Sequence, residues 1–206
     1  MRIKSYCINL ERAIERKKSF EKNWRGILGE RLEYFVAVDG RNLLANDYLS
    51  NTQLACLRSH LSLMEKALRT EEDFFLILED DAIPEYDNIL GIIEYIYKST
   101  GGCDILICCL RERYVVFLKK ILHIPEDEFK ILNNMADYYS EGTCAVFYTR
   151  KGLKDYIHHF SQETFCADMY GTLPKEVNTA FIVPALVSHR DIDSYISENY
   201  GRIFIK

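Results

Sequence analysis

Two kinds of apolar pattern alternate along this chain of 206 residues. Short continuous apolar runs are typical of buried strands, and an apolar residue every three or four positions is typical of amphipathic helices. The runs predict strands at residues 3–10, 32–38, 74–78, 104–110, 143–149 and 178–183. The helical spacing predicts helices at residues 11–27, 54–69, 86–97 and 152–160. This alternation favours an α/β fold with a mixed, mostly parallel sheet flanked by helices.

The most informative run is 74–78, because three acids, Glu79, Asp80 and Asp81, follow it at once. Ligands of open α/β sheets bind at the carboxyl ends of strands, where these acids are expected. In extended backbone Glu79 and Asp81 share a face and Asp80 points away. Two carboxylates on one face can hold a hard divalent ion through oxygen. The alternative is a solvated turn, since Asp is common where strands end.

A second candidate site lies at the first strand-to-helix junction, with Asn9, Arg12 and Arg16. The amino end of a helix favours phosphate, and two arginines four residues apart can face one anion. The alternative is a surface helix in which the arginines pair with Glu11 and Glu15.

Two later residues are chemical candidates. His189 could complete a metal site, since imidazole also binds manganese, or it could be an exposed terminal histidine. Asp168 lies among apolar residues, where an acid can gain the raised proton affinity of a general base. It could equally be a helix N-cap.

Composition adds limits to this picture. An apolar content of 48% and a charged content of 28% are those of an ordinary soluble protein, and the length favours one domain spanning 1–206. The net charge of −5 gives no support for nucleic-acid binding. The sequence contains no Ser–His–Asp elbow, P-loop or GxGxxG fingerprint, which argues against hydrolases, P-loop kinases and classical dehydrogenases.

The seven cysteines include no CxxC pair, so they indicate neither a zinc ribbon nor a full disulfide framework. Free, buried thiols, and hence a reducing compartment, are expected for the cysteines within apolar runs. These are Cys7, Cys103, Cys108, Cys109 and Cys144. With no visible signal peptide and no apolar run long enough to cross a bilayer, the expected location is cytoplasmic.

Residues 111–125 interrupt the alternation with cationic and aromatic side chains. This patch could bind an anionic acceptor or a membrane surface, or it could be a strand or helix with a solvated basic edge.

Several motifs follow one another in a recognisable order. They are Ile8-Asn9-Leu10-Glu11-Arg12 with Arg16, Val38-Asp39-Gly40, Cys56-Leu57-Arg58-Ser59-His60, Leu78-Glu79-Asp80-Asp81-Ala82, Gly142-Thr143-Cys144-Ala145 and Asp168. Together they resemble glycosyltransferase family 25, which includes bacterial lipooligosaccharide galactosyltransferases and collagen galactosyltransferases. The resemblance covers about residues 3–189 and implies a GT-A fold, with a Rossmann-like nucleotide-sugar half and a DxD-type motif that binds manganese.

The resemblance also implies roles for individual residues. The implied ligands of Mn²⁺ (or Mg²⁺) are Glu79, Asp81 and His189, and the implied catalytic base is Asp168. Asn9, Arg12 and Arg16 are implied to line the nucleotide pocket. Asp39 and Gly40 would contact uracil or ribose, and Asp80 would lie near ribose or the sugar. Gly142 and Thr143 would lie beside the donor sugar or acceptor.

The implied activity is an inverting, metal-dependent transfer of a hexose, galactose, from a UDP-sugar to a glycan acceptor in lipooligosaccharide or lipopolysaccharide biosynthesis. Residues 1–110 would form the nucleotide-sugar half and 111–206 the acceptor side, with peripheral association at the cytoplasmic face of the inner membrane. The alternatives are a non-catalytic nucleotide-sugar-binding or interaction module, and a metal-dependent phosphoester hydrolase. The chain departs from the family pattern at 52–55, where Thr-Gln-Leu-Ala replaces Gly-Glu-Ile-Gly and predicts a different loop geometry.

Overall fold

The computed structural model describes residues 1–109, 119–120, 123, 130–133 and 144–189. Its main feature is a seven-stranded sheet with the strand order β2-β1-β3-β7-β5-β8-β6. The strands are β1 (Ile3–Asn9), β2 (Leu32–Val36), β3 (Phe74–Glu79), β5 (Ile105–Ile107), β6 (Lys130–Asn133), β7 (Ala145–Thr149) and β8 (Thr179–Val183). Five of them run in one direction, and β7 and β6 run in the other. The predicted mixed, mostly parallel sheet is confirmed.

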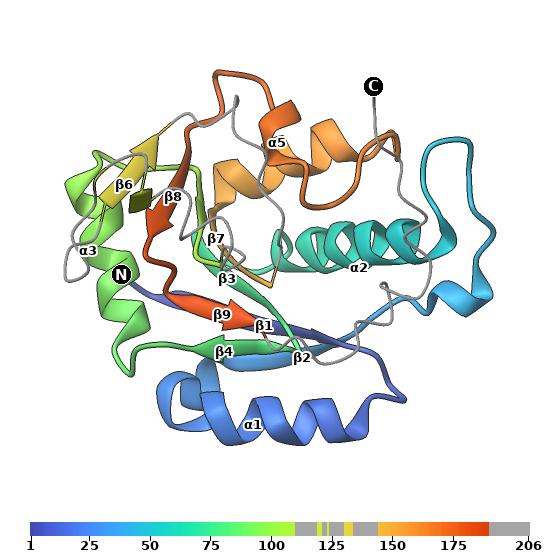
Figure 1. Cartoon of the computed structure of the whole chain (residues 1–206), viewed down its shortest axis with the longest axis horizontal. Helices are drawn as coiled ribbons and strands as arrows, with labels where there is room; N and C mark the ends of the chain where they lie inside the picture. The colour runs from blue at the N-terminus through green and yellow to red at the C-terminus, as the bar shows by residue number, and fades with distance from the viewer. Residues whose placement is uncertain (110–118, 121–122, 124–129, 134–143, 190–206) are drawn as a thin grey trace.

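Helices cover both faces of the sheet (Figure 1). One face carries α1 (Ile14–Leu28) and α3 (Ile89–Ser99), and the other carries α2 (Asn51–Ala67) and α5 (Arg150–Phe160). Side chains alternate along β3: Phe75 and Ile77 pack in the α2–α5 core, whereas Leu76 and Leu78 pack in the α1–α3 core. Because successive side chains of a strand point to opposite faces, β3 is buried on both faces, which explains its continuous apolar run.

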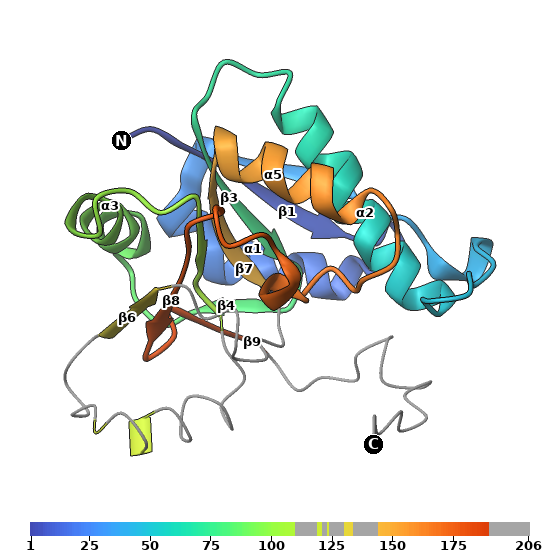
Figure 2. The same cartoon turned by 90° about the horizontal axis from the view of Figure 1, so that it is seen from above.

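A second, two-stranded sheet joins β4 (Ala82–Pro84) to β9 (Val187–His189) in antiparallel pairing. The small sheet lies beside α1, as both cartoon views show (Figures 1 and 2). The indole nitrogen of Trp24 on α1 donates to the carbonyl oxygen of Ala82 at 2.8 Å, which fixes α1 against β4. The hydrophobic pattern does not predict either strand, because three residues are too few for a period to emerge.

Element boundaries differ from the predictions by a few residues. Helix α1 begins at Ile14 because the chain first makes a turn in which the Ala13 amide donates to the Leu10 carbonyl. Helix α2 begins three residues earlier than predicted, at Asn51, because Ser50 and Gln53 form a capping box. The substituted segment 52–55 is therefore the first turn of α2. Short 3₁₀ helices lie at η1 (Gly29–Arg31), η2 (Gly40–Asn42) and η3 (Tyr170–Thr172).

The cysteine prediction is wrong for one pair. Cys109 and Cys144 form a disulfide, with 6.1 Å between their Cα atoms, because the antiparallel register of β5 and β7 places them opposite each other. Cys7, Cys103 and Cys108 are free and buried, as predicted. The disulfide removes two of the five thiols from which a reducing compartment was inferred.

Several predicted features lie outside the described residues. These are Gly142, Thr143 and most of the cationic stretch 111–125. In the described part of the chain, no helix is both long and apolar enough to cross a bilayer.

Candidate functional site

The candidate site forms where β1 and β3 end side by side. Their parallel register pairs Ile8 with Glu79, so the next residues, Asn9 and Asp80, meet. The Asn9 amide donates to Asp80 Oδ2 at 2.6 Å and to the Ala13 carbonyl at 3.3 Å. Arg16, in the first turn of α1, donates from Nη2 to Asp80 Oδ1. Only 6% of Asp80 is exposed, so its carboxylate links two strand ends to α1 inside the protein.

Arg12 and Arg16 contact different carboxylates. Arg12 Nε lies 3.2 Å from Asp39 Oδ2, and Arg41 Nη2 lies 2.7 Å from the same oxygen. The hydrogen bonds from Arg41, and then the charge of Arg12, lower the pKa of Asp39. Asp39 also caps η2 by accepting from the Arg41 amide. The structure thus brings Arg12 and Asp39 together beside the ends of β1 and β2.

Gly40 allows η2 to pack closely against α2. A Cβ atom at this position would lie 3.1 Å from the Asn51 carbonyl oxygen and 3.2 Å from Thr52 Cα. Close packing against α2 therefore explains a glycine at this turn, independently of any ligand.

Asp81 lies in the turn after β3, beside Arg16 and His189. The strand ends at Glu79, so the extended alternation on which the shared-face prediction relied does not continue to Asp81. Asp81 Oδ2 is 3.9 Å from Arg16 Nη2, and its buried Oδ1 has no hydrogen-bond partner among the described residues. His189 is half-buried and pairs with Ala82 across the small sheet, one residue from Asp81.

The electrostatic setting of Asp81 is unusual for a carboxylate. Burial raises its pKa to about 6, and the charge of Glu79 adds to the rise. The charges of Arg16 and His189 oppose it. A partly buried acid near another acid, with one buried and unpaired oxygen, is an environment that a cation would stabilise.

Glu79 faces α2 on the other side of the sheet from α1. Its Oε1 atom is 3.0 Å from His60 Nε2 and 3.9 Å from Cys56 Sγ. Its backbone amide donates to the Cys144 carbonyl at 2.9 Å, which anchors this strand end to the start of β7. Sequence reasoning assigned no role to Cys56 or His60, although their spacing of four residues on a predicted helix was a usable signal.

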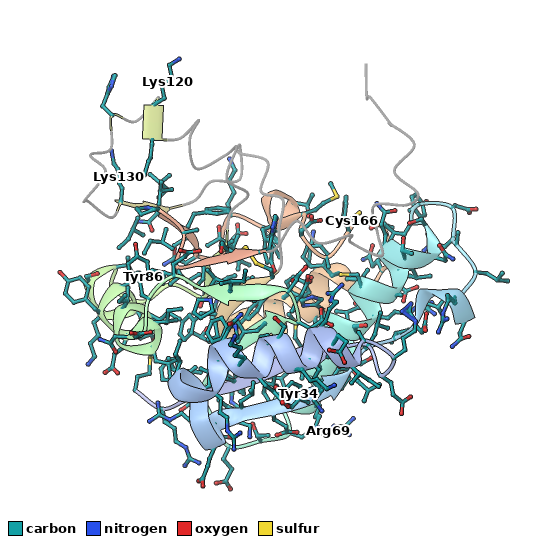
Figure 3. The ribbon with its side chains drawn as sticks, turned by 60° about the horizontal axis from the view of Figure 1, so that its bottom comes forward. Tyr34, Arg69, Tyr86, Lys120, Lys130 and Cys166 are labelled. Atoms are coloured by element: carbon teal, nitrogen blue, oxygen red, sulfur yellow. A yellow bond between two sulfur atoms is a disulfide. The ribbon has the colours of Figure 1, made fainter. Side chains whose placement is uncertain are left out.

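Asp168 lies in the loop between α5 and η3. Figure 3 labels Cys166 on this loop, which crosses beside α2. Arg58 of α2 holds the loop through two hydrogen bonds to Glu163, at 2.6 and 2.8 Å. The Tyr156 hydroxyl donates to the Ala167 carbonyl at 2.6 Å. The predicted alternative of a helix N-cap is wrong, because Met169 occupies that position of η3.

The charges of Asp168 and Glu79 both influence the thiol of Cys56 on α2. Burial raises the pKa of the Cys56 thiol well above its usual range, and the charges of Glu79 and then Asp168 raise it further. Both acids therefore act on one thiol from opposite elements. The printed contacts thus join Asn9, Arg16, Asp80 and Asp81 where β1 and β3 end. Arg12 and Asp39 form a separate pair.

A family comparison matches most of the chain. The model of "Glycosyltransferase family 25 (LPS biosynthesis protein)" matches residues 2–162. The match includes every motif residue before Asp168 and excludes Asp168 and His189. A search of curated proteins gives no match.

Solved structures resemble the fold at low sequence identity. A glycosyltransferase involved in the glycosylation of the major capsid of PBCV-1 is 13% identical, with a TM-score of 0.54, and the alignment covers 95% of each chain. The galactosyltransferase LgtC, solved with donor and acceptor sugar analogs, is 10% identical, with a TM-score of 0.43 and coverage of 96% of this chain and 91% of that chain. A197 from STIV is 13% identical, with a TM-score of 0.42 and coverage of 91% and 83%. At these identities the first of the three supports a common fold and nothing further.

Proposed function

The chain belongs to glycosyltransferase family 25, and from this premise we propose that it transfers a hexose, galactose, from a UDP-sugar to a glycan hydroxyl in lipooligosaccharide biosynthesis. Family and fold make it a glycosyltransferase with a GT-A architecture. The donor, the inverting stereochemistry and the metal dependence are the proposed part. The observation that carries the proposal is the convergence of Asn9, Arg16, Asp80 and Asp81 where β1 and β3 end.

The residues around Asp81 fit a hard divalent ion such as Mn²⁺ or Mg²⁺. The buried Asp81 Oδ1 has no hydrogen-bond partner in the described part of the chain, and a carboxylate oxygen is a ligand that such ions prefer. His189 offers an imidazole one residue away across the β4–β9 pairing, and Glu79 precedes Asp81 by two residues. When bound there, the ion would stabilise the negative charge that develops on the departing diphosphate.

Arg12 and Arg16 would orient the nucleotide. Both lie at the amino end of α1, where the helix dipole favours phosphate. Their protein partners, Asp39 and Asp80, hold the guanidinium groups in place before the donor arrives. Such pre-organisation reduces the side-chain entropy lost on binding.

Asp168 would accept the proton of the acceptor hydroxyl as that oxygen attacks the anomeric carbon. The bond to the UDP oxygen breaks as the new glycosidic bond forms, which inverts the anomeric centre. The loop that bears Asp168 is fixed at Glu163 and Ala167, so the carboxylate is held by contacts made elsewhere on the loop. Positioning of this kind is what a general base requires.

A thermal-shift screen tests the proposal. Ligands that bind only the native state raise the unfolding temperature, so UDP and UDP-hexoses should raise it in the presence of Mn²⁺ and raise it less without the ion. Adenosine and guanosine diphosphate sugars serve as controls for the base. An unfolding temperature that no nucleotide sugar changes, with or without Mn²⁺, would contradict the proposal.

Product analysis separates the two alternative functions. A transferase releases UDP in proportion to glycan product, whereas a phosphoester hydrolase releases inorganic phosphate or a sugar phosphate. A non-catalytic module would give the thermal shift without any release of UDP across a panel of acceptors.

A further inference from the structure

Cys56, His60 and Glu79 form a compact group of three different ligand types. Cys56 and His60 lie one turn apart on α2, so their side chains share a face of that helix. Glu79, the last residue of β3, faces them from the sheet. One ligand atom from each residue lies within 4.8 Å of the other two. We propose that this group is a binding site for a borderline-soft divalent ion of the Zn²⁺ class, separate from the hard-ion site at Asp81.

The distances suit a tetrahedral ion. Zinc binds sulfur at about 2.3 Å and nitrogen or oxygen at about 2.0–2.1 Å, so tetrahedral ligands lie about 3.3–3.6 Å apart. The His60 Nε2 to Glu79 Oε1 distance is 3.0 Å, and the Cys56 Sγ to Glu79 Oε1 distance is 3.9 Å. These two edges lie on either side of the tetrahedral value. Each of these two distances can reach the tetrahedral value with a movement of a few tenths of an ångström, and the third, from Cys56 Sγ to the His60 ring, is within 4.8 Å.

The donor set selects the class of ion. Thiolate and imidazole are ligands of Zn²⁺ and Co²⁺, whereas Mn²⁺ and Mg²⁺ prefer oxygen. The Asp81 environment differs in this respect, because the donors there are carboxylate and imidazole. The two sites therefore favour different ions. Glu79 is a member of the Cys56–His60 group, and Asp81 follows it by two residues.

The surroundings favour a cation. The acids Asp81 and Asp168 lie close enough to Cys56 to act on its thiol. His60 is 1% exposed, and its Nδ1 has no hydrogen-bond partner among the described residues. When His60 Nε2 is unprotonated, its lone pair and Glu79 Oε1 face each other at 3.0 Å, and a cation could bind both atoms. The Glu79 side chain is 24% exposed, so this member of the group is in contact with solvent.

The proposed site has a consequence for the transferase reaction. An ion bound to Glu79 Oε1 would hold this carboxylate in its present position against α2, so that it could not also bind an ion at Asp81. Zn²⁺ is therefore expected to antagonise the Mn²⁺-dependent reaction. That consequence depends on the proposed function, but the ion site itself does not.

Cobalt absorption tests the site directly, without any nucleotide sugar. The full chain is freed of metal with a chelator and titrated with Co²⁺. One equivalent should produce a thiolate-to-cobalt charge-transfer band in the near ultraviolet and the intense visible bands of tetrahedral cobalt, and Zn²⁺ should remove both. Cys56→Ser should lose the thiolate band, and His60→Gln should bind Co²⁺ at least tenfold more weakly.

Two control variants isolate the site. Cys166→Ser removes another half-buried free thiol from the same region and should keep the band. Asp81→Asn removes the proposed hard-ion ligand and should also keep it. Far-ultraviolet circular dichroism checks that each variant is folded, and Cys56→Ala provides a second test if Cys56→Ser is not.

The proposal is overturned if the wild-type chain shows no thiolate band with excess Co²⁺, or if the folded Cys56→Ser variant keeps it. In either case Glu79, His60 and Cys56 form only a hydrogen-bonded group. Failure of the proposed function looks different, because a chain that binds cobalt through Cys56 but transfers no sugar still supports the site.

Discussion

Replacing Asp80 with alanine should strongly destabilise the protein, because its buried carboxylate joins β1, β3 and α1. The substitution removes the acceptor of the Asn9 amide at 2.6 Å and of the Arg16 guanidinium. It leaves the Arg16 side chain, which is 26% exposed, without the Asp80 carboxylate.

The magnitude follows from burial. Breaking one side of a buried ion pair costs about 3–5 kcal/mol, and the lower end applies because Arg16 retains some contact with water. We therefore expect a loss of about 3 kcal/mol in the free energy of unfolding. For a chain of this size that loss lowers the melting temperature by about 6–12 °C.

Urea denaturation followed by circular dichroism measures the effect. With a slope of about 2 kcal/mol per molar urea, the midpoint should fall by about 1.5 M. Asp155→Ala is the matched control, because Asp155 pairs with Lys151, whose side chain is 59% exposed, and surface pairs contribute at most about 1 kcal/mol. In a double-mutant cycle with Arg16→Met, the two losses should not add, with a coupling of about 2 kcal/mol.

A loss below about 1 kcal/mol for Asp80→Ala would refute this reasoning. It would mean that the contacts of Asp80 do not hold the strand ends together. A variant of normal stability with a raised KM for the donor would instead favour the ribose or sugar contact that the family resemblance implies for Asp80.

Three further predictions address other parts of the molecule. The pKa of Asp81 is raised to about 6 from an unfolded value of about 3.9, so its ionised form destabilises the metal-free protein as pH rises through that window. Asp81→Asn should thus raise the melting temperature at pH 7.5 by an amount worth about 2–3 kcal/mol and leave it unchanged at pH 4; equal shifts at both pH values would contradict this. Gly152→Ala should lower the free energy of unfolding, measured with urea, by at least about 2 kcal/mol, because its Cβ would lie 2.1 Å from a backbone oxygen. Gly26→Ala, which has open space in α1, should raise that free energy by about 0.5–1 kcal/mol. Similar effects at both positions would be inconsistent with the packing. Tyr156→Phe should lose about 1 kcal/mol and lower kcat more than it raises KM, because the lost hydrogen bond fixes the loop beside Asp168; an unchanged kcat would remove that positioning role.

The site could be predicted from sequence where it depends on strand ends. Parallel neighbouring strands end at one edge of a sheet. Asn9, the last residue of β1, therefore meets Asp80, which directly follows β3. Alternation along β3 also explains why Glu79 shares the α2 face with Phe75 and Ile77. Both inferences use only local periodicity and one parallel pairing.

The rest depends on pairings that local patterns do not encode. His189 reaches Asp81 through β9, a three-residue strand that pairs with a segment more than a hundred residues earlier. The Cys109–Cys144 disulfide follows from the register of β5 with β7. An apolar run predicts that a strand exists but does not identify its partner or register.

The most direct test of the proposed transferase is the rate of UDP release from UDP-galactose, with and without Mn²⁺, for the wild-type chain and for Asp81→Ala. The assay contains a lipooligosaccharide-type glycan acceptor, and glycan product is quantified alongside UDP. If Asp81 is a ligand of the proposed ion, its loss should lower the Mn²⁺-dependent rate by about 10²-fold or more, because the leaving group would lose that stabilisation. Melting curves of both proteins, recorded in the same buffer, show whether the variant is folded. We predict Mn²⁺-dependent release of UDP by the wild type and almost none by the variant; equal rates, with metal dependence unchanged, would contradict the assignment.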